Sequence, residues 1–421
     1  MTIFKNSILY IASTGISKGL PFLLLPFFTR FLSVEEFGVL GIAMVIVSIL
    51  SIVIGFSPFL YLITRFYQIG KAGIASSIFH IFIISFACLV FMVTAILLAP
   101  NALARYGISD AMFLILSIVA LFRVVINVGL TIQQMEKRGL RFLIVNVCFA
   151  GLMFVFIFFL VAVFARGWRG VMAAELMAGI IISAYLVHRL VLEEYIVVGF
   201  RWERVRNILR FSLPLIPHVL ALWVMNFIDR FFLAEMTDME SVGLYSTAYL
   251  LGFGLSLLHE SVQRAWQPYF FQYLTHGRAE LKNRIVKYTW AYYVVSVIIF
   301  FVYVEMIRLF LPVLVGVEYM SSMEFVPMIA LAYTVLGMYR VIAGYLYVGN
   351  RTITLAAVTV FAAIVNISMN YVLIPVNGAI GAAQATLIAF VVMFLIVKYI
   401  VIRTSGMPWI SALTFGNLKG T

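Results

Sequence analysis

The stretch FSLPLIPHVLALWVMNFIDRFFLAEMTDMESVGLYSTAYLLG, from Phe211 to Gly252, contains the pattern that decides the fold. Its first eighteen residues carry no formal charge, and they are followed by an Asp-Arg pair, a short acidic loop and a second apolar run. A bilayer core about 30 Å thick requires roughly 20 mostly apolar residues in each spanning helix. The stretch therefore predicts two membrane-spanning helices joined by a short loop.

The composition extends this prediction to the whole chain. Of its 421 residues, 64% are hydrophobic and only 11% are charged, whereas soluble domains carry roughly 25% charged residues. Continuous runs such as AGLMFVFIFFLVAVF (150–164) favour helices, because strands of a membrane barrel alternate apolar and polar residues. We therefore expect an all-α polytopic membrane protein.

Apolar runs of spanning length recur along the chain. We expect twelve helices, at 8–29, 37–60, 75–99, 111–134, 142–165, 170–191, 211–233, 242–263, 288–311, 325–347, 353–375 and 379–401. The first run continues into LLLPFFTRF without a small-residue cleavage site, so we expect a retained helix and not a signal peptide. Cys88 and Cys148 both fall within predicted spans, which favours packing roles over a disulfide.

The distribution of lysine and arginine predicts the orientation. The loops on the side of the two termini carry nineteen basic residues, and the opposite loops carry four. Basic residues accumulate in cytoplasmic loops, so we expect both termini in the cytoplasm and the chain in a bacterial inner membrane. The net charge of +12 then follows from topology, and no nucleic-acid partner is needed to explain it. The basic segment RWERVRNILR (201–210) could be a solvated linker or could touch anionic lipid headgroups.

Two halves of the chain share one pattern. Glu35 and Gly38 match Glu240 and Gly243, 205 residues further on, within the common order of apolar helix, arginine, acidic loop, glycine and new helix. Two later pairs of segments match in the same order: KRGLRFLIVNV (137–147) with VGNRTITLAAV (348–358), and GWRGVMAAEL (167–176) with NGAIGAAQAT (377–386). This predicts a duplicated six-helix unit, with lobes at 1–192 and 211–421 joined by a cytoplasmic linker at 193–210. An even number of helices gives both lobes the same orientation, an arrangement that places transporter substrate sites between the halves.

These motifs resemble a known family. The Asp-Arg pair, the acidic loop and SVGLYSTAYLLGFGLSLLHESVQRAWQPYFF (241–271) resemble the second-lobe signature of bacterial polysaccharide-biosynthesis membrane proteins, the Wzx-type flippases of O-antigen and exopolysaccharide repeat units. LPFFTRFLSVEEFGVLGIA (25–43) and the C-terminal GNRT, NYVLIP and GAIGAAQAT extend the likeness over nearly the whole chain. The family belongs to the multidrug/oligosaccharidyl-lipid/polysaccharide exporter superfamily.

The resemblance implies a V-shaped transporter with two lobes around a central cavity. It would move an undecaprenyl-pyrophosphate-linked oligosaccharide from the cytoplasmic to the periplasmic leaflet by alternating access. Its partners would be this anionic lipid-linked substrate, membrane lipids, and a polysaccharide polymerase with its chain-length regulator. No cofactor and no metal site are expected.

Three basic residues lie deep in the predicted spans. Lys18, Arg123 and Arg340 are about 15, 18 and 22 Å into their helices at 1.5 Å per residue. Charged residues inside the bilayer usually face a cavity or a partner. A water-filled, cationic substrate cavity and a buried structural pairing are therefore the two alternatives for these residues.

Charges nearer the helix ends are candidates for a gate or an inter-lobe contact. Asp229 and Arg230 could instead anchor a helix end at the headgroups, although adjacent helical residues point about 100° apart, so one of them is expected to turn toward the other lobe. The same gate role is considered for Glu175, Glu305 and Arg308. Glu305 and Arg308, three residues apart, could pair on one helix face.

Proline pairs occupy the first helix of each half. Pro21 and Pro26 fall in the first span, and Pro214 and Pro217 in the seventh. Proline removes a helix hydrogen bond and bends the axis. Hinges and static packing kinks are both open as roles for these residues.

Two other functions remain as alternatives. A cation-coupled drug exporter of the same superfamily would suit an acidic cavity, whereas the deepest charges here are basic. A membrane polymerase or ligase would need a constellation of catalytic residues. The predicted periplasmic loops are short, and the five histidines and seventeen acidic residues show neither a metal-ligand cluster nor paired carboxylates. We therefore expect a transporter and not an enzyme.

Overall fold

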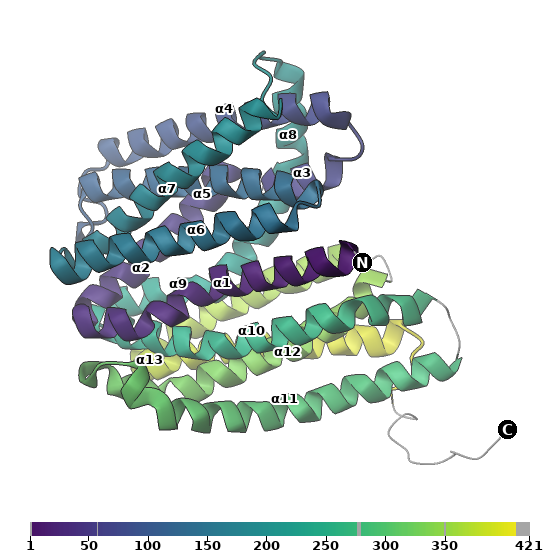
Figure 1. Ribbon diagram of the computed structural model, residues 1–421. Coiled ribbons are helices and arrows are strands. Elements are labelled where there is room, and N and C mark those ends of the chain that lie inside the picture. The colour runs from purple at the N-terminus through teal and green to yellow at the C-terminus, as the bar shows by residue number, and fades with distance from the viewer. Residues whose placement is uncertain (1, 57, 276–278, 349–350, 410–421) are drawn as a thin grey trace. The chain divides into compact units, whose positions relative to one another are not determined.

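The computed structural model describes residues 2–56, 58–275, 279–348 and 351–409, and these form helices joined by short turns (Figure 1). The α-helices are α1 (Thr2–Phe31), α2 (Val34–Gly55), α3 (Pro58–Arg65), α4 (Gly70–Leu98), α5 (Asp110–Met135), α6 (Gly139–Ile157), α7 (Gly167–Leu192), α8 (Trp202–Ser212), α9 (Ile216–Met236), α10 (Met239–Thr275), α11 (Ala279–Leu314), α12 (Val326–Val348) and α13 (Thr352–Thr404). A π-helical segment at Phe158–Val163 extends α6, and a 3-10 turn at Leu213–Leu215 joins α8 to α9. The all-α class predicted from composition is confirmed.

Ten helical segments of the described chain are long and apolar enough to span a membrane. The last of them, Ile353–Thr404, covers two predicted spans, and its helix is broken at Gly378, where φ is 56° and ψ is −136°. Helix α1 contributes a shorter apolar stretch, Gly19–Phe31. With α1 counted and α13 divided at Gly378, the helices match the twelve predicted spans.

Packing divides the chain into two compact units. Unit 1 comprises residues 1–223 together with 238–243, which include the start of α10, and unit 2 comprises residues 224–237 and 244–421. The lobe boundaries at 192 and 211 remain a prediction, because a division by packing does not test where the cytoplasmic linker lies.

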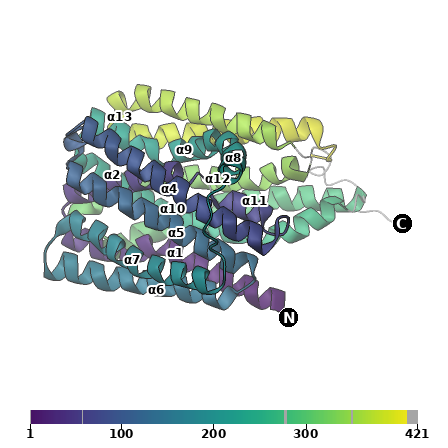
Figure 2. The same ribbon diagram turned by 90° about the horizontal axis from the view of Figure 1, so that it is seen from above.

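In unit 1, α5 occupies the centre. It packs against α2, α4, α6 and α7, which run alongside it in both views (Figure 1, Figure 2). Helix α1 packs against α6. Half of the apolar window of α5 is buried, whereas only 22% of the α4 window and 28% of the α6 window are buried. The outer helices therefore present apolar side chains to the surroundings, as a membrane requires.

In unit 2, α12 packs against both α11 and α13. Leu255 of α10, Val304 of α11 and Ala330 of α12 form a small buried cluster. Polar groups are also enclosed here, among them Asn366 and Asn370 on α13, which are hydrogen-bonded to each other at 3.2 Å.

The two halves repeat each other in local geometry. Gly38 and Gly243, the matched pair of the sequence, make reciprocal close contacts within unit 1: a Cβ at Gly38 would clash with the carbonyl oxygen of Met239, and one at Gly243 with that of Val34. Gly167 and Gly378, from the matched segments 167–176 and 377–386, both have a φ of 56°. Glycine adopts such left-handed values without steric cost. The duplication therefore explains both pairs.

Candidate functional site

The deep arginine of unit 1 is paired with a carboxylate. Arg123 lies on α5, and its Nε is 2.5 Å from Oε1 of Glu175 on α7. Glu175 is 5% exposed, while about a third of the Arg123 side chain is accessible. A buried pairing is one of the two alternatives that the sequence leaves open for Arg123, and the structure shows such a pair with Glu175, a residue that the sequence predicts only as part of a gate or inter-lobe contact. The cavity role of Arg123 and the gate role of Glu175 stay predictions, as does that of Lys18, whose side chain lies outside the described residues.

Arg340 of unit 2 has polar neighbours and no carboxylate partner among the described ion pairs. It lies half-buried on α12, and its Nη1 donates to Oγ of Ser256 at 3.5 Å. Gln263 donates its side-chain Nε2 to the Arg340 carbonyl oxygen at 3.3 Å. The charge of this guanidinium is therefore not neutralised within the described part of unit 2.

A histidine and a tyrosine lie close to this arginine. Gly337, one helical turn before Arg340, leaves room for the ring of His259 from α10. The Nδ1 atom of His259 is 2.8 Å from the hydroxyl of Tyr292 on α11, while its buried Nε2 has no hydrogen-bond partner in the described structure. Ser256 and His259 of α10 and Tyr292 of α11 thus lie near Arg340. Such polar groups can bind an anion or water.

Asp229 and Arg230 form the most deeply buried charged pair in the described residues. Their exposed fractions are 1% and 6%, and Nη1 of Arg230 lies 3.0 Å from Oδ1 of Asp229. Tyr245 donates its hydroxyl to Oδ2 of Asp229 at 2.5 Å, and Tyr249 places its ring 4.1 Å from the Arg230 guanidinium. The two side chains do not point apart as expected, and their burial leaves no surface for an interfacial anchor. Their gate or inter-lobe role stays a prediction.

The other predicted residues lie on α1, α9 and α11 and in the turn before α9. Arg308 and Glu305 form the expected i,i+3 pair at 2.7 Å, with more than half of each side chain exposed. Pro21 and Pro26 lie inside α1. Pro214 lies in the 3-10 turn between α8 and α9, and Pro217 is the second residue of α9. The second proline pair therefore marks a junction between helices, and its hinge role remains untested.

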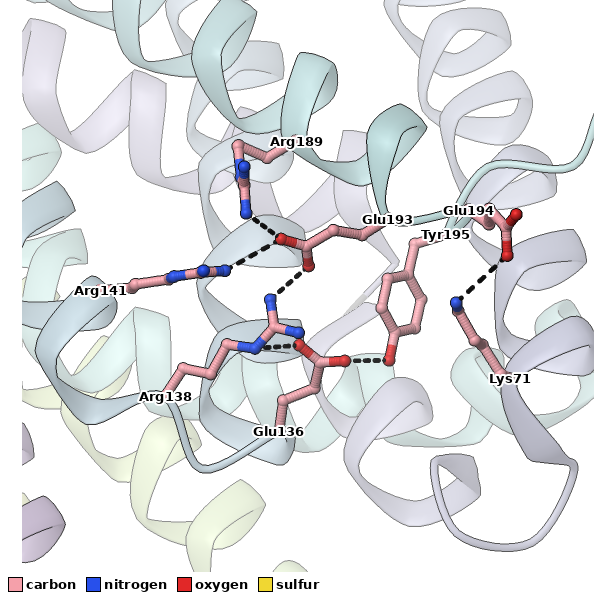
Figure 3. Close-up of polar contacts among 8 residues, drawn as sticks. All are labelled: Lys71, Glu136, Arg138, Arg141, Arg189, Glu193, Glu194 and Tyr195. Carbon is pink, nitrogen blue, oxygen red and sulfur yellow. Dashed lines mark hydrogen bonds and ion pairs between the residues drawn. The ribbon is translucent and has the colours of Figure 1, made fainter.

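A charged cluster at one end of unit 1 was not anticipated from the sequence (Figure 3). Glu193, directly after α7, forms ion pairs with Arg138, Arg141 and Arg189. Nη1 of Arg141 lies 3.0 Å from Oε1 of Glu193. Arg138 also pairs with Glu136 at 2.7 Å. Burial alone would raise the pKa of the Glu193 carboxyl, but the hydrogen bonds and charges of Arg138 and Arg189 outweigh it and hold this pKa below its ordinary value.

Residues after Glu193 extend the attachment along the predicted linker. Glu194 pairs with Lys71 at 3.4 Å, and Tyr195 donates to Oε1 of Glu136 at 2.6 Å (Figure 3). Burial and the Glu136 carboxylate raise the pKa of Tyr195. The backbone N–H of Arg201 donates to Nε2 of His80, a fully buried residue of α4. The segment 193–201 is therefore fastened to unit 1 at several points, and α8 follows it.

The sequence offered one signal for this cluster. Arg189 and Glu193 are four residues apart at the end of a helix, a spacing that places both on one face. Arg138 and Arg141, at the start of α6, are more than fifty residues away from Glu193, so only the fold could bring them to it.

Solved structures show the same fold in transporters. The chain resembles a structure titled "Lipid II flippase MurJ, inward closed conformation", with a TM-score of 0.67, 16% identity, and coverage of 94% of this chain and 87% of that one. It also resembles an inward-facing multidrug resistance MATE family transporter of the MOP superfamily, with a TM-score of 0.63, 16% identity, and coverage of 94% and 95%.

Sequence comparisons relate the chain to two proteins and to one protein family. "Lsg locus putative protein 1" of Haemophilus influenzae is 23% identical over 278 residues, 65% of this chain and 67% of the relative. An "Uncharacterized membrane protein" of the same organism is 24% identical over 290 residues, 67% of this chain and 69% of the relative. The profile of the family described as "Polysaccharide biosynthesis protein" matches residues 3–274. With most of its length matched in this way, the chain belongs to the polysaccharide biosynthesis protein family of multi-pass membrane proteins.

Proposed function

We propose that this protein is a flippase that moves an undecaprenyl-pyrophosphate-linked oligosaccharide, the repeat unit of an O-antigen or related surface polysaccharide, between the leaflets of the bacterial inner membrane. Movement is from the cytoplasmic to the periplasmic leaflet by alternating access, with both termini in the cytoplasm. The family membership supports a role in polysaccharide synthesis, and the fold shared with a flippase and with MOP transporters supports transport.

The single observation that carries the mechanism is the uncompensated charge of Arg340. An arginine inside the bilayer without a carboxylate is costly unless water or an anion is close. A pyrophosphate can accept two parallel hydrogen bonds from a guanidinium, and Ser256, His259 and Tyr292 add further polar groups on the neighbouring helices. We assign Arg340 to contact the pyrophosphate or an acidic sugar, with Lys18 and Arg123 as the other basic residues of the path.

Arg123 differs from Arg340 in this scheme. Its charge is balanced by Glu175, so it offers hydrogen-bond donors without adding net charge. Loss of Arg340 should therefore reduce transport more than loss of Arg123 does. Lysine at position 340 should keep part of the activity, because it keeps the charge and loses the planar fork.

The alternative of a cation-coupled drug exporter has less support. Such a transporter needs a carboxylate that is free to take up a cation, and the two buried carboxylates of the described spans, Glu175 and Asp229, are each paired with an arginine.

Pro214 and Pro217 remain hinge candidates under either function. Their joint replacement by alanine should slow transport more than it lowers protein abundance.

The test is complementation of a deletion strain at matched protein abundance. Deletion should cause the lipid-linked intermediate to accumulate in the cytoplasmic leaflet, where mass spectrometry identifies it, and Arg340→Ala should restore surface polysaccharide poorly. Arg284→Ala is the control, since it removes an exposed arginine of the same unit. Normal export by a Lys18→Ala/Arg123→Ala/Arg340→Ala variant would contradict the cationic path. Unchanged polysaccharide in the deletion strain would contradict the function itself.

A further inference from the structure

A small surface cavity lies beside the charged cluster of unit 1. The end of α5, the start of α6 and the end of α7 form its walls, and its polar lining comprises Gln133, Arg138, Arg141, Tyr185, Arg189 and Glu193. It belongs to unit 1, whereas Arg340 belongs to unit 2. Neither the predicted cationic path nor the gate residues include its arginines.

The arginines of this cavity outnumber the carboxylates they hold. Arg138, Arg141 and Arg189 converge on Glu193, and among the described ion pairs only Arg138 has a second acidic partner, Glu136 (Figure 3). A guanidinium has five N–H donors, and nearly half of the Arg141 side chain is exposed. The cluster can therefore bind an additional anion. The Glu193 carboxylate already occupies part of this anion-binding site.

A buried amide in the same wall points to a ligand that carries hydroxyl groups. Gln133 is 8% exposed, lines the cavity, and has an Oε1 atom with no hydrogen-bond partner in the described structure. Buried polar atoms without a partner are uncommon, because leaving one unsatisfied costs its full desolvation. A headgroup that combines a phosphate with hydroxyl donors would satisfy the arginines and this amide together.

Exposed apolar side chains continue from the cavity along the outside of α6 and α7. Leu140 and Ile144 on α6 and Ile181 and Tyr185 on α7 each have at least 45% of their surface exposed. The two helices lie side by side (Figure 1, Figure 2), and Val145 packs against Ile182 and Leu186 next to the cavity. Because α6 and α7 are candidate membrane spans, this surface is suited to acyl chains.

We propose that the cavity is a binding site for an anionic phospholipid of the bilayer. The lipid phosphate contacts Arg138, Arg141 and Arg189, the hydroxyl groups of a glycerol-type headgroup reach Gln133, and the acyl chains lie along the exposed faces of α6 and α7. Basic pockets between membrane helices on the cytoplasmic side bind such headgroups. Glu193 competes with the phosphate, so lipid binding weakens one of the points that fasten segment 193–201. The site is independent of the proposed flippase function.

Native mass spectrometry of the purified full-length protein tests the site. The dissociation constant of the first bound lipid is measured for phosphatidylglycerol and for zwitterionic phosphatidylcholine of the same chain length. We expect phosphatidylglycerol to bind at least about fivefold more tightly, since each basic residue near an anionic headgroup contributes about that factor. Arg141→Gln/Arg189→Gln should abolish the preference. Arg206→Gln, which removes an exposed arginine of α8 outside the cavity, should keep it.

A variant expected to bind phosphatidylglycerol more tightly shows whether loss of binding in the other variants is due to misfolding. Glu193→Gln removes the competing carboxylate, so it should strengthen phosphatidylglycerol binding severalfold and leave phosphatidylcholine unchanged. Soluble glycerol phosphate at millimolar concentration should not displace the lipid, because it lacks the acyl chains. Equal binding of the two lipids by the wild type, weaker binding by Glu193→Gln, or displacement by glycerol phosphate would each overturn the proposal.

Discussion

Arg123 and Glu175 form an ion pair across α5 and α7, with Nε of the arginine 2.5 Å from Oε1 of the glutamate. The pair is neutral as a unit, so a deep arginine adds no net charge to the bilayer core. The glutamate is almost fully buried, and its second oxygen, Oε2, has no hydrogen-bond partner in the described structure. The buried charge of Glu175 is therefore stabilised by Arg123.

Removing one partner of this pair should destabilise the protein more than removing both. Breaking a buried pair typically costs about 3–5 kcal/mol, and we expect the lower end for Arg123→Leu because part of that side chain is exposed. Arg123→Leu/Glu175→Leu should recover most of the loss. The measurement is the midpoint of thermal unfolding in detergent. A double variant as unstable as Arg123→Leu would show that the pair is not the cause.

The Asp229 network makes a second prediction. Tyr245→Phe removes a hydrogen bond to a buried carboxylate, which should cost about 1.5–3 kcal/mol. Tyr303→Phe is the control: its hydroxyl donates to the neutral carbonyl oxygen of Leu251 at 2.5 Å, so its loss should cost about 0.5–1.5 kcal/mol. Phenylalanine keeps the ring in both variants. Urea unfolding of both variants compares the two costs, and a larger loss for Tyr303→Phe would contradict this account.

The fold could be predicted from the sequence because its signal is local. Each span is a run of about twenty apolar residues, and even the break in α13 falls at Gly378, in the gap left between two predicted spans. The repeat could be recognised in the sequence because Gly38 and Gly243 make equivalent close contacts with a backbone carbonyl, and each contact excludes any side chain larger than that of glycine.

The partners of the charged residues could not be predicted in the same way. Arg123 and Glu175 are 52 residues apart, and their meeting depends on how α5 packs on α7. For Asp229 and Arg230 the backbone directions were a misleading guide: the long arginine side chain folds back to the Asn226 carbonyl and to its neighbour's carboxylate. Helical geometry fixes where a side chain starts and not where a guanidinium ends.

The reciprocal glycine contact makes a third prediction. Gly38→Ala or Gly243→Ala places a methyl group against a backbone carbonyl, which cannot move aside as a flexible side chain can. Overpacking of this kind typically costs about 1–3 kcal/mol. Gly151→Ala in α6 is the control, since nothing lies within 4 Å of the added atom. Thermal unfolding of the three variants at matched concentration should separate them, and an equal effect of Gly151→Ala would refute the packing explanation.

The proposed topology makes a fourth prediction. Reporter fusions at Ser33, Asp110 and Glu318 should report the periplasm, and those at Gln68 and Gly139 the cytoplasm. The reason is the excess of lysine and arginine in the loops assigned to the cytoplasm. A cytoplasmic signal at Glu318, in the second half, would contradict the parallel orientation of the two repeats.

Glu193 should make stability depend on pH in acid. Burial raises the pKa of the Glu193 carboxyl, but the hydrogen bonds and charges of Arg138 and Arg189 outweigh it and hold the folded pKa below the ordinary value of 4.5. A carboxyl with a depressed pKa contributes stability above its unfolded pKa, and this contribution is lost as the pH falls through the folded value. In detergent without added phospholipid, Glu193→Gln should therefore be less stable than the wild type at neutral pH, and the difference should shrink as the pH falls below 4.5. Glu194→Gln is the matched control, because that side chain is 84% exposed and has a single ion pair with Lys71. Unfolding midpoints of the three proteins across this range decide the matter, and a constant offset between wild type and Glu193→Gln would mean that the arginines do not stabilise the ionised carboxylate.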